Sequence, residues 1–170
     1  MFREANVEDL SALRDLEREA NLAGLGHLFP ADRHPFPEDA VLARWALVLE
    51  DPDVTVLVLD GEPGRRGRRS LDAFAAYDSR TLRHLAVRPD QWGAGIASAA
   101  IETVLHAMAR RGTAVAELWC LEENHRARRL YDYLGWQATD DRRPTPWPPH
   151  PTELRYTRLI PRTDAAERCT

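Results

Sequence analysis

The stretch VRPDQWGAGIAS, residues 87–98, decides the fold. Gly93 and Gly95 free the backbone from Cβ constraints, so several consecutive N–H groups can point into one concavity. A helix is expected to begin directly afterwards, and it adds its own free N–H groups and the positive end of its dipole. The segment therefore predicts a pyrophosphate site that needs no lysine. An ordinary glycine turn that enters a helix explains Gly-Ala-Gly alone equally well.

The segments on either side of this stretch predict a βαβ unit. Residues 82–87 and 115–121 have the apolar pattern of strands, and the intervening helix has an apolar face that ends where Gly112 can cap it. This order predicts two parallel neighbouring strands joined by a right-handed crossover. The dinucleotide fingerprint nearly fits Gly93 to Ser98, but that motif directly follows the first strand of a larger sheet, so this context excludes it.

The rest of the chain predicts one mixed α/β domain over residues 1–160 and a flexible C-terminal tail over 161–170. A central sheet of about six or seven strands flanked by about four helices is expected. Residues 71–77 and 82–87 predict an antiparallel hairpin. The arginine-rich segment 61–70 is interpreted as a solvated connection rather than an anion-binding loop. Residues 142–151 are proline-rich and predict an extended connector.

Composition excludes several classes of protein. The 170-residue chain contains no lysine, which excludes a phosphate-loop NTPase and a pyridoxal enzyme. Its net charge of −4 does not support binding to nucleic acid or to an anionic membrane. The six histidines are scattered, so no metal site is expected. No apolar segment is long enough to span a membrane, no secretory leader is recognisable, and two cysteines suit a reducing cytoplasm, so a cytoplasmic protein is expected.

A second block of sequence lies at residues 124–136, with the pattern Asn124-x-x-Ala127-Arg128-x-Leu130-Tyr131-x-x-Leu134-Gly135-Trp136. Together with the first block, Val87-x-Pro89-x-x-Trp92-Gly93-x-Gly95-Ile96-Ala97, it resembles the acetyl-CoA motifs of the GNAT family of N-acetyltransferases in order and spacing. The closely matched part covers about residues 82–136. The resemblance implies acetyl-CoA as co-substrate, an amine as acceptor and a GNAT-like fold in which two parallel strands splay at the cofactor site.

The resemblance also implies roles for individual residues. Backbone groups of 85–87 would meet the pantetheine arm, 92–97 would wrap the pyrophosphate, and Asn124 would contact the pantetheine. The cofactor-binding residues that it implies are Leu85, Ala86, Val87, Trp92, Gly93, Ala94, Gly95, Ile96, Ala97, Asn124, Ala127 and Arg128. The family usually has Gln or Arg where this chain has Trp92. Arg126, Arg128 and Arg129 are either partners of CoA phosphates or a solvated helix face.

Two residues are candidates for the chemistry of transfer. The resemblance implies that Tyr131 sits near the thioester sulfur, where its hydroxyl is suited to protonate the departing thiolate; the alternative is a core tyrosine on an amphipathic helix. Glu117 interrupts an apolar strand, so its carboxylate is a candidate base or a paired structural group. His84, acting through water, is an alternative base. The position at which some relatives carry a basic glutamate is Trp119 here.

The sequence therefore predicts direct transfer of an acetyl group from acetyl-CoA to the amine of a small molecule or peptide. The acceptor pocket is expected among the 21–37 loop, the helix with Trp45 and the connector with Trp147. A silent acyl-CoA-binding regulatory module and, against the net charge, a nucleic-acid binder are the alternatives. A homodimer is compatible with the sequence.

Overall fold

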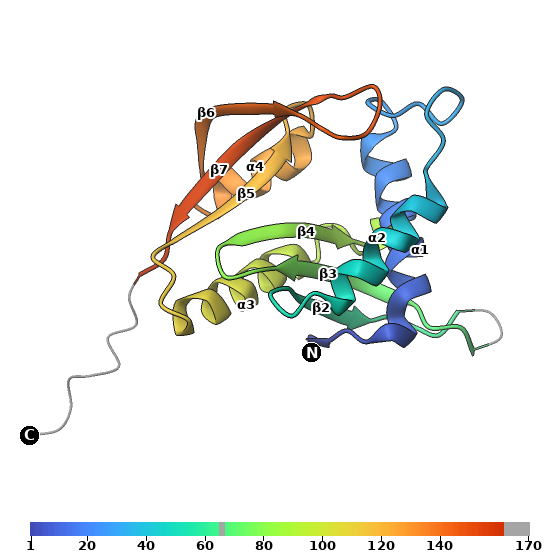
Figure 1. Cartoon of the computed structure of the whole chain (residues 1–170), viewed down its shortest axis with the longest axis horizontal. Coiled ribbons are helices and arrows are strands. Elements are labelled where there is room, and N and C mark those ends of the chain that lie inside the picture. Colours follow the sequence, from blue (N-terminus) through green and yellow to red (C-terminus); the bar gives the residue numbers. More distant parts are fainter. Residues whose placement is uncertain (65–66, 162–170) are drawn as a thin grey trace, which may run out of the picture.

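The computed structural model describes residues 1–64 and 67–161. Within them, seven strands form one mixed sheet in the order β1-β2-β3-β4-β5-β7-β6 (Figure 1). The strands are β1 (Arg3–Glu4), β2 (Thr55–Asp60), β3 (Leu71–Tyr77), β4 (Thr81–Val87), β5 (Val115–Leu121), β6 (Gln137–Pro144) and β7 (Thr152–Leu159). The α-helices are α1 (Leu10–Leu25), α2 (Glu38–Glu50), α3 (Ile96–Arg110) and α4 (His125–Tyr133). This confirms the predicted fold class. All but the first residue of the expected tail lie outside the described residues.

The helices cover the two faces of the sheet. Ile101 and Val104 of α3 are buried in one core together with Leu118 of β5. On the other face, Leu13 of α1 and Trp45 of α2 are buried in a second core. Both helix pairs therefore present an apolar stripe to the sheet, as amphipathic helices do. None of the described helices is both long and apolar enough to cross a bilayer.

The parallel pair β4–β5 divides the sheet. It pairs only at Thr81 with Glu117 and at Leu82 with Leu118. Every other neighbouring pair in the described sheet is antiparallel. Beyond Leu82 the two strands diverge, so the last residues of β4 have no partner on the β5 side. The predicted splay is confirmed, and it leaves main-chain N–H and C=O groups of β4 free to bind something else.

The proline-rich connector is shorter than the sequence predicts. β6 extends to Pro144, because Arg142, Arg143 and Pro144 resume pairing with β7 after an irregularity in register. β6 is an edge strand, and Pro144 is its last residue, where a missing N–H costs no ladder hydrogen bond.

The segment between β2 and β3 connects antiparallel strands, as expected. Two of its arginines contact carboxylates in or just before α1: Arg69 binds those of Glu8 and Asp9, and Arg68 lies 3.4 Å from Asp15. Residues 65–66 lie outside the described part of the chain. The described arginines thus pair with carboxylates of the protein itself.

Candidate active site

A cavity of about 400 Å³ lies where β4 and β5 diverge. It is enclosed by α1, the end of β4, the loop to α3, the start of α3 and α4. Its lining residues are Ala20, Asn21, Gly24, Leu25, Leu85, Ala86, Val87, Gln91, Trp92, Gly93, Gly95, Ile96, Ala97, Ser98, Asn124, Arg126, Ala127, Leu130, Tyr131 and Tyr133. We call this cavity the cofactor cleft. It contains most of the residues that the two sequence blocks predicted, and Ala94 and Arg128 are not among its lining.

Main-chain groups make one end of the cofactor cleft. Gly93 and Gly95 have φ of 88° and 80°, the left-handed region that glycine adopts without strain. Gly95 is the N-cap of α3 and provides no side chain to bond the helix N–H groups. Among the described residues, the N–H groups of Gly95 to Ser98 have no recorded acceptor. A row of unpaired N–H groups at the positive end of a helix is an anion site.

Trp92 closes this end of the cleft from the side. Its indole N–H donates to the carbonyl of Val87 at 2.8 Å. Its ring packs against α1, where a Cβ added to Gly24 would lie 3.6 Å from it. The guanidinium of Arg126 stacks on the same ring, 3.9 Å from its centre. The indole N–H of Trp92 is therefore already bonded and does not replace the Gln or Arg side chain as a phosphate donor. Its ring instead keeps the guanidinium of Arg126 beside the loop.

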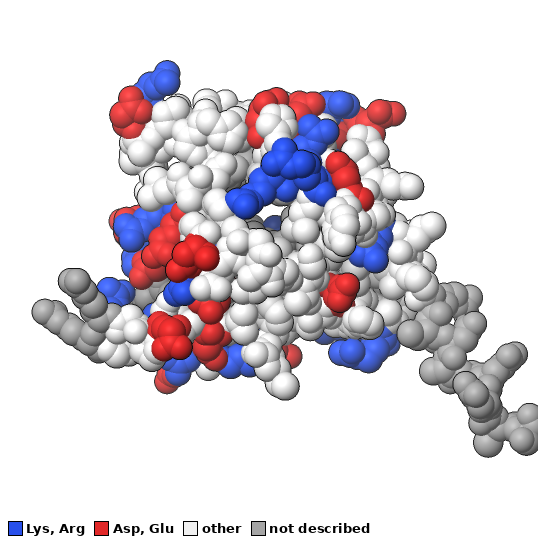
Figure 2. Space-filling model, turned by 180° about the vertical axis from the view of Figure 1, so that it is seen from behind, with Lys and Arg blue, Asp and Glu red and all other residues white. Residues whose placement is uncertain are grey.

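Arg126 is the one charged residue among the cleft-lining residues of the described chain. Figure 2 shows basic side chains gathered beside a hollow on the face opposite to that of Figure 1. Asn124 caps α4, since its side chain accepts the N–H of Ala127 at 3.1 Å. Asn124 is therefore the N-cap of α4, and its amide nitrogen is left over for another partner.

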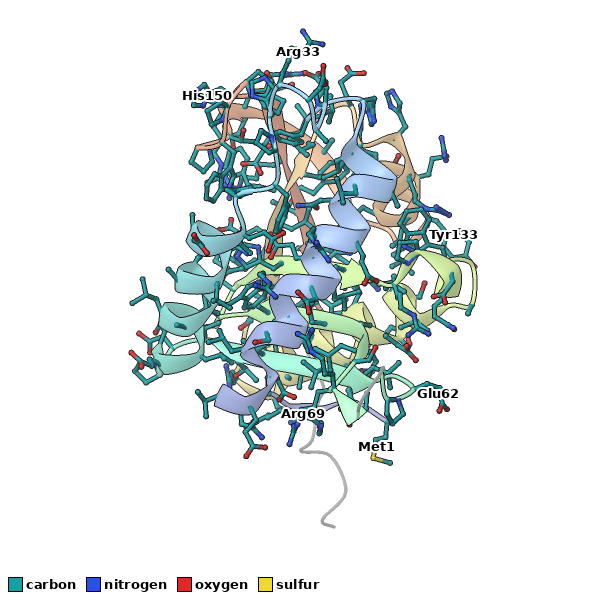
Figure 3. The ribbon with its side chains drawn as sticks, turned by 90° about the vertical axis from the view of Figure 1, so that its right-hand side faces the viewer. Met1, Arg33, Glu62, Arg69, Tyr133 and His150 are labelled. Atoms are coloured by element: carbon teal, nitrogen blue, oxygen red, sulfur yellow. The ribbon has the colours of Figure 1, made fainter. Side chains whose placement is uncertain are left out.

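Tyr131 also lines the cofactor cleft, as the buried tyrosine of α4, whereas Tyr133, labelled in Figure 3, is exposed. Burial, and then the neighbouring Cys120 and Tyr156, raise the pKa of Tyr131 well above its ordinary value. The phenol is therefore protonated at neutral pH. Burial likewise raises the pKa of Cys120 to about 12, so its thiol is not ionised.

The structure separates two predicted site residues from this cleft. The carboxylate of Glu117 is held by Arg155 at 2.7 Å and lies 3.4 Å from Arg80, at the closed end of the splayed pair. Arg128 donates to the hydroxyl of Tyr156 at 3.1 Å and to the carbonyl of Glu122 at 2.9 Å. Both side chains already have partners within the protein. Glu117 connects β5 to β7, and Arg128 connects α4 to β7.

His84 lies on the face of β4 that carries α1 and α2. Its ring centre is 5.4 Å from that of Trp45. Burial, with Arg44 and Arg83 nearby, lowers the pKa of His84 to about 3. The imidazole is neutral at pH 7 and has lost most of its basicity. His84 is therefore a weak candidate for a base.

A second cavity, of about 280 Å³, lies on the α1–α2 side of the sheet and is called here the acceptor cavity. Its lining residues are Glu17, Asn21, Leu22, Phe29, Arg33, His34, Pro35, Phe36, Pro37, Val41, Trp147 and Pro148. Asn21, Phe29, His34 and Trp147 lie in segments at which such a pocket was expected, whereas Glu17 does not. The available signal was a carboxylate and an amide four residues apart on α1, on the helix face that includes buried Leu13. No group of metal-binding side chains occurs among the described residues.

The comparisons with known proteins agree with this geometry. The model of the "Acetyltransferase (GNAT) family" matches residues 10–136, three quarters of the chain. The chain therefore belongs to the GNAT acetyltransferase family. No curated protein matches it in sequence.

Solved structures share the fold at low sequence identity. The ribosomal-protein-S18-alanine N-acetyltransferase from Escherichia coli is 22% identical, with a TM-score of 0.68 over 100% of this chain and 98% of that one. The spermidine N-acetyltransferase from Vibrio cholerae, solved with CoA and spermine, is 16% identical, with a TM-score of 0.67 over 95% and 96%. The acetyltransferase yncA from Salmonella typhimurium, solved with acetyl-CoA, is 18% identical, with a TM-score of 0.64 over 99% and 98%.

Proposed function

We propose that this protein transfers an acetyl group from acetyl-CoA directly to the amine of a small molecule or peptide. The observation that carries the proposal is a single cleft that is lined both by the unpaired N–H groups of residues 95–98 and by the protonated phenol of Tyr131. The diphosphate of CoA would bind the N–H groups, with Arg126 beside it. The pantetheine would extend along the unpaired edge of residues 85–87. The family membership and the CoA-bound relatives support this placement.

The residues divide the chemistry as follows. The neutral amine nitrogen forms a bond to the acetyl carbonyl carbon and loses one N–H proton to water, and the carbon–sulfur bond then breaks. Tyr131 gives its proton to the departing sulfur and regains one from water, so the products are the amide and the CoA thiol. An acceptor that arrives as an ammonium releases one further proton to solvent. Cys120 supports direct transfer, because a buried protonated thiol is a poor nucleophile for an acetyl-enzyme.

Glu117 is not assigned the role of base. Its carboxylate already accepts a hydrogen bond from Arg155 and faces Arg80, and it does not line the cofactor cleft. Deprotonation of the acceptor is assigned instead to water at the junction of the two cavities.

The test combines two measurements on the full chain. Thermal stability is followed with and without CoA, and release of free thiol from acetyl-CoA is followed over a panel of amines. We expect stabilisation by CoA and thiol release that depends on the amine. Stabilisation without thiol release on any amine would instead favour a silent acyl-CoA-binding module.

A further inference from the structure

The acceptor cavity has an apolar wall made by two connections. Four aromatic or proline side chains come from the α1–α2 connection and two from the β6–β7 connection: Phe29, Pro35, Phe36, Pro37 and, from the second connection, Trp147 and Pro148, with Leu22 of α1 adjoining. Figure 3 labels Arg33 and His150, one on each connection, at the same end of the molecule. At about 280 Å³, the cavity is at the small end of ligand pockets, which span roughly 300–1,000 Å³.

Glu17 is the one carboxylate in the described lining of this cavity. Its Oε2 accepts both from Arg44 and from the indole N–H of Trp45, the latter at 2.7 Å. Its Oε1 has no recorded donor among the described residues, and the side chain keeps 14% of its exposure. The two bonds to Oε2 fix the carboxylate, so Oε1 is a preoriented acceptor for a cation that enters the cavity.

Asn21 connects the two cavities. It lines both the acceptor cavity and the cofactor cleft, and it lies one helical turn after Glu17 on the same face of α1. A positive group at Glu17 therefore lies at the border from which the cofactor cleft opens. The apolar wall extends away from that border, toward the two connections.

We propose that the acceptor is a primary monoamine carried on one apolar group of about aromatic size, and that Glu17 holds its ammonium. This inference rests on the proposed function, since it assumes that the acceptor cavity serves the acetyl transfer. The apolar group fills the space between Phe36 and Trp147. The nitrogen is left at Glu17 and Asn21, and after losing a proton it faces the acetyl group.

The same lining disfavours the acceptors of two structural relatives. A polyamine needs a partner for each ammonium, but the other charged or titratable residues of the wall are Arg33 and His34, and Glu17 is shared with Arg44. A peptide needs donors for its carbonyl groups. Pro35, Pro37 and Pro148 have no N–H to donate.

The first experiment compares three acceptors with the full chain and acetyl-CoA: 2-phenylethylamine, spermidine and an alanyl tripeptide. We expect kcat/KM for 2-phenylethylamine to exceed the other two by at least about tenfold, the ratio that about 1.4 kcal/mol provides. A preference for spermidine or the peptide would overturn the inference and leave the proposed acetyl transfer standing.

The second experiment tests Glu17 without using activity. Quenching of tryptophan fluorescence reports binding of 2-phenylethylamine and of its uncharged analogue 2-phenylethanol. Glu17→Gln should weaken amine binding by about 10- to 100-fold and leave alcohol binding unchanged, because only the charge-assisted bond is lost. Glu19→Gln is the matched control, since Glu19 is exposed on the same helix and does not line the cavity. An unchanged preference for the amine in Glu17→Gln would contradict the assignment.

A third variant guards against misfolding of Glu17→Gln, which leaves Arg44 without its carboxylate. Trp147→Ala removes part of the apolar wall and should weaken both 2-phenylethylamine and 2-phenylethanol by about three- to tenfold, with CoA affinity retained. Equal binding in this variant would overturn the placement of the apolar group. Glu17-dependent amine binding without thiol release would support the pocket and overturn the proposed catalysis.

Discussion

The cofactor cleft and the acceptor cavity meet on α1, but they are built differently. The groups proposed to bind the diphosphate are main-chain N–H groups of one segment, Gly95 to Ser98. The cavity consists of side chains from α1, α2 and two distant connections. A main-chain site needs glycines and a helix start at fixed spacing, which the sequence displays. A side-chain site across several segments can change its lining residue by residue, so it is suited to determine acceptor specificity.

The largest expected effect is on the main-chain site. Gly95→Val should lower CoA affinity by at least about 100-fold, as measured by calorimetry. The added side chain projects from a residue in the left-handed conformation into the open cleft. Gly112→Val is the matched control. Gly112 has the same backbone conformation and the same open surroundings at the other end of α3. Valine is strained to a similar degree at both positions. Equal CoA affinity in the two variants would therefore show that the main chain at Gly95 does not bind CoA.

The next largest effect is expected on kcat, from substitution of Tyr131 in the cofactor cleft. Tyr131→Phe should lower kcat by about ten- to a thousandfold with CoA affinity retained, as for loss of a general acid. Because burial raises the pKa of Tyr131, its proton should remain through the alkaline range, and kcat in the wild type should show no loss below pH 9 that depends on this residue. Tyr77→Phe removes the hydroxyl of another buried tyrosine outside the cleft and should leave kcat unchanged.

A smaller effect is expected where a side chain supplements the main-chain site. Arg126→Ala should lower the affinity for CoA by about tenfold and make that affinity less dependent on salt, as for loss of one charged contact. Trp92→Leu should weaken CoA by a similar factor, because the arginine loses its stacking partner. Arg129→Ala, on the exposed face of α4, serves as control and should bind CoA normally. If Arg126→Ala binds CoA as tightly as the wild type does, Arg126 makes no contribution and the main-chain N–H groups bind CoA without it.

The smallest effect on either cavity should come from substitution of Asp9, the N-cap residue of α1, the helix that both cavities share. Burial raises the pKa of Asp9, but hydrogen bonds from Arg3, the Asn6 N–H and Arg69 outweigh it and lower the pKa to about 2. The lowered pKa contributes stability above about pH 4, which is lost as the pH falls through 2. Asp9→Asn should therefore lower the free energy of unfolding by about 2 kcal/mol at pH 7, and by less near pH 2.

Urea unfolding at the two pH values measures this difference. Asp60→Asn, which removes a more exposed partner of Arg3, should cost less than about 1 kcal/mol. Once folded, Asp9→Asn should bind CoA and amine as the wild type does. A selective loss at one cavity would show that the two regions do not share α1 equally.

The sequence predicted the elements whose signals are local. Gly93 and Gly95, which mark the expected turn, and Gly112, which marks the expected helix end, all have positive φ in the structure. Partners distant in the chain were not predictable. Glu117 was a candidate base until the structure brought Arg155 beside it, 38 residues away. Glu17 was visible as a carboxylate on a buried helix face, but only the packing of two connections shows that it lines a cavity. The stacking of Arg126 on Trp92 likewise depends on how α4 lies beside the loop.

A crystal structure of this protein with CoA tests the central claim most directly. We expect the diphosphate within hydrogen-bonding distance of the N–H groups of Gly95 to Ser98, and the sulfur next to the hydroxyl of Tyr131. A diphosphate bound elsewhere, or a sulfur remote from that hydroxyl, would contradict it.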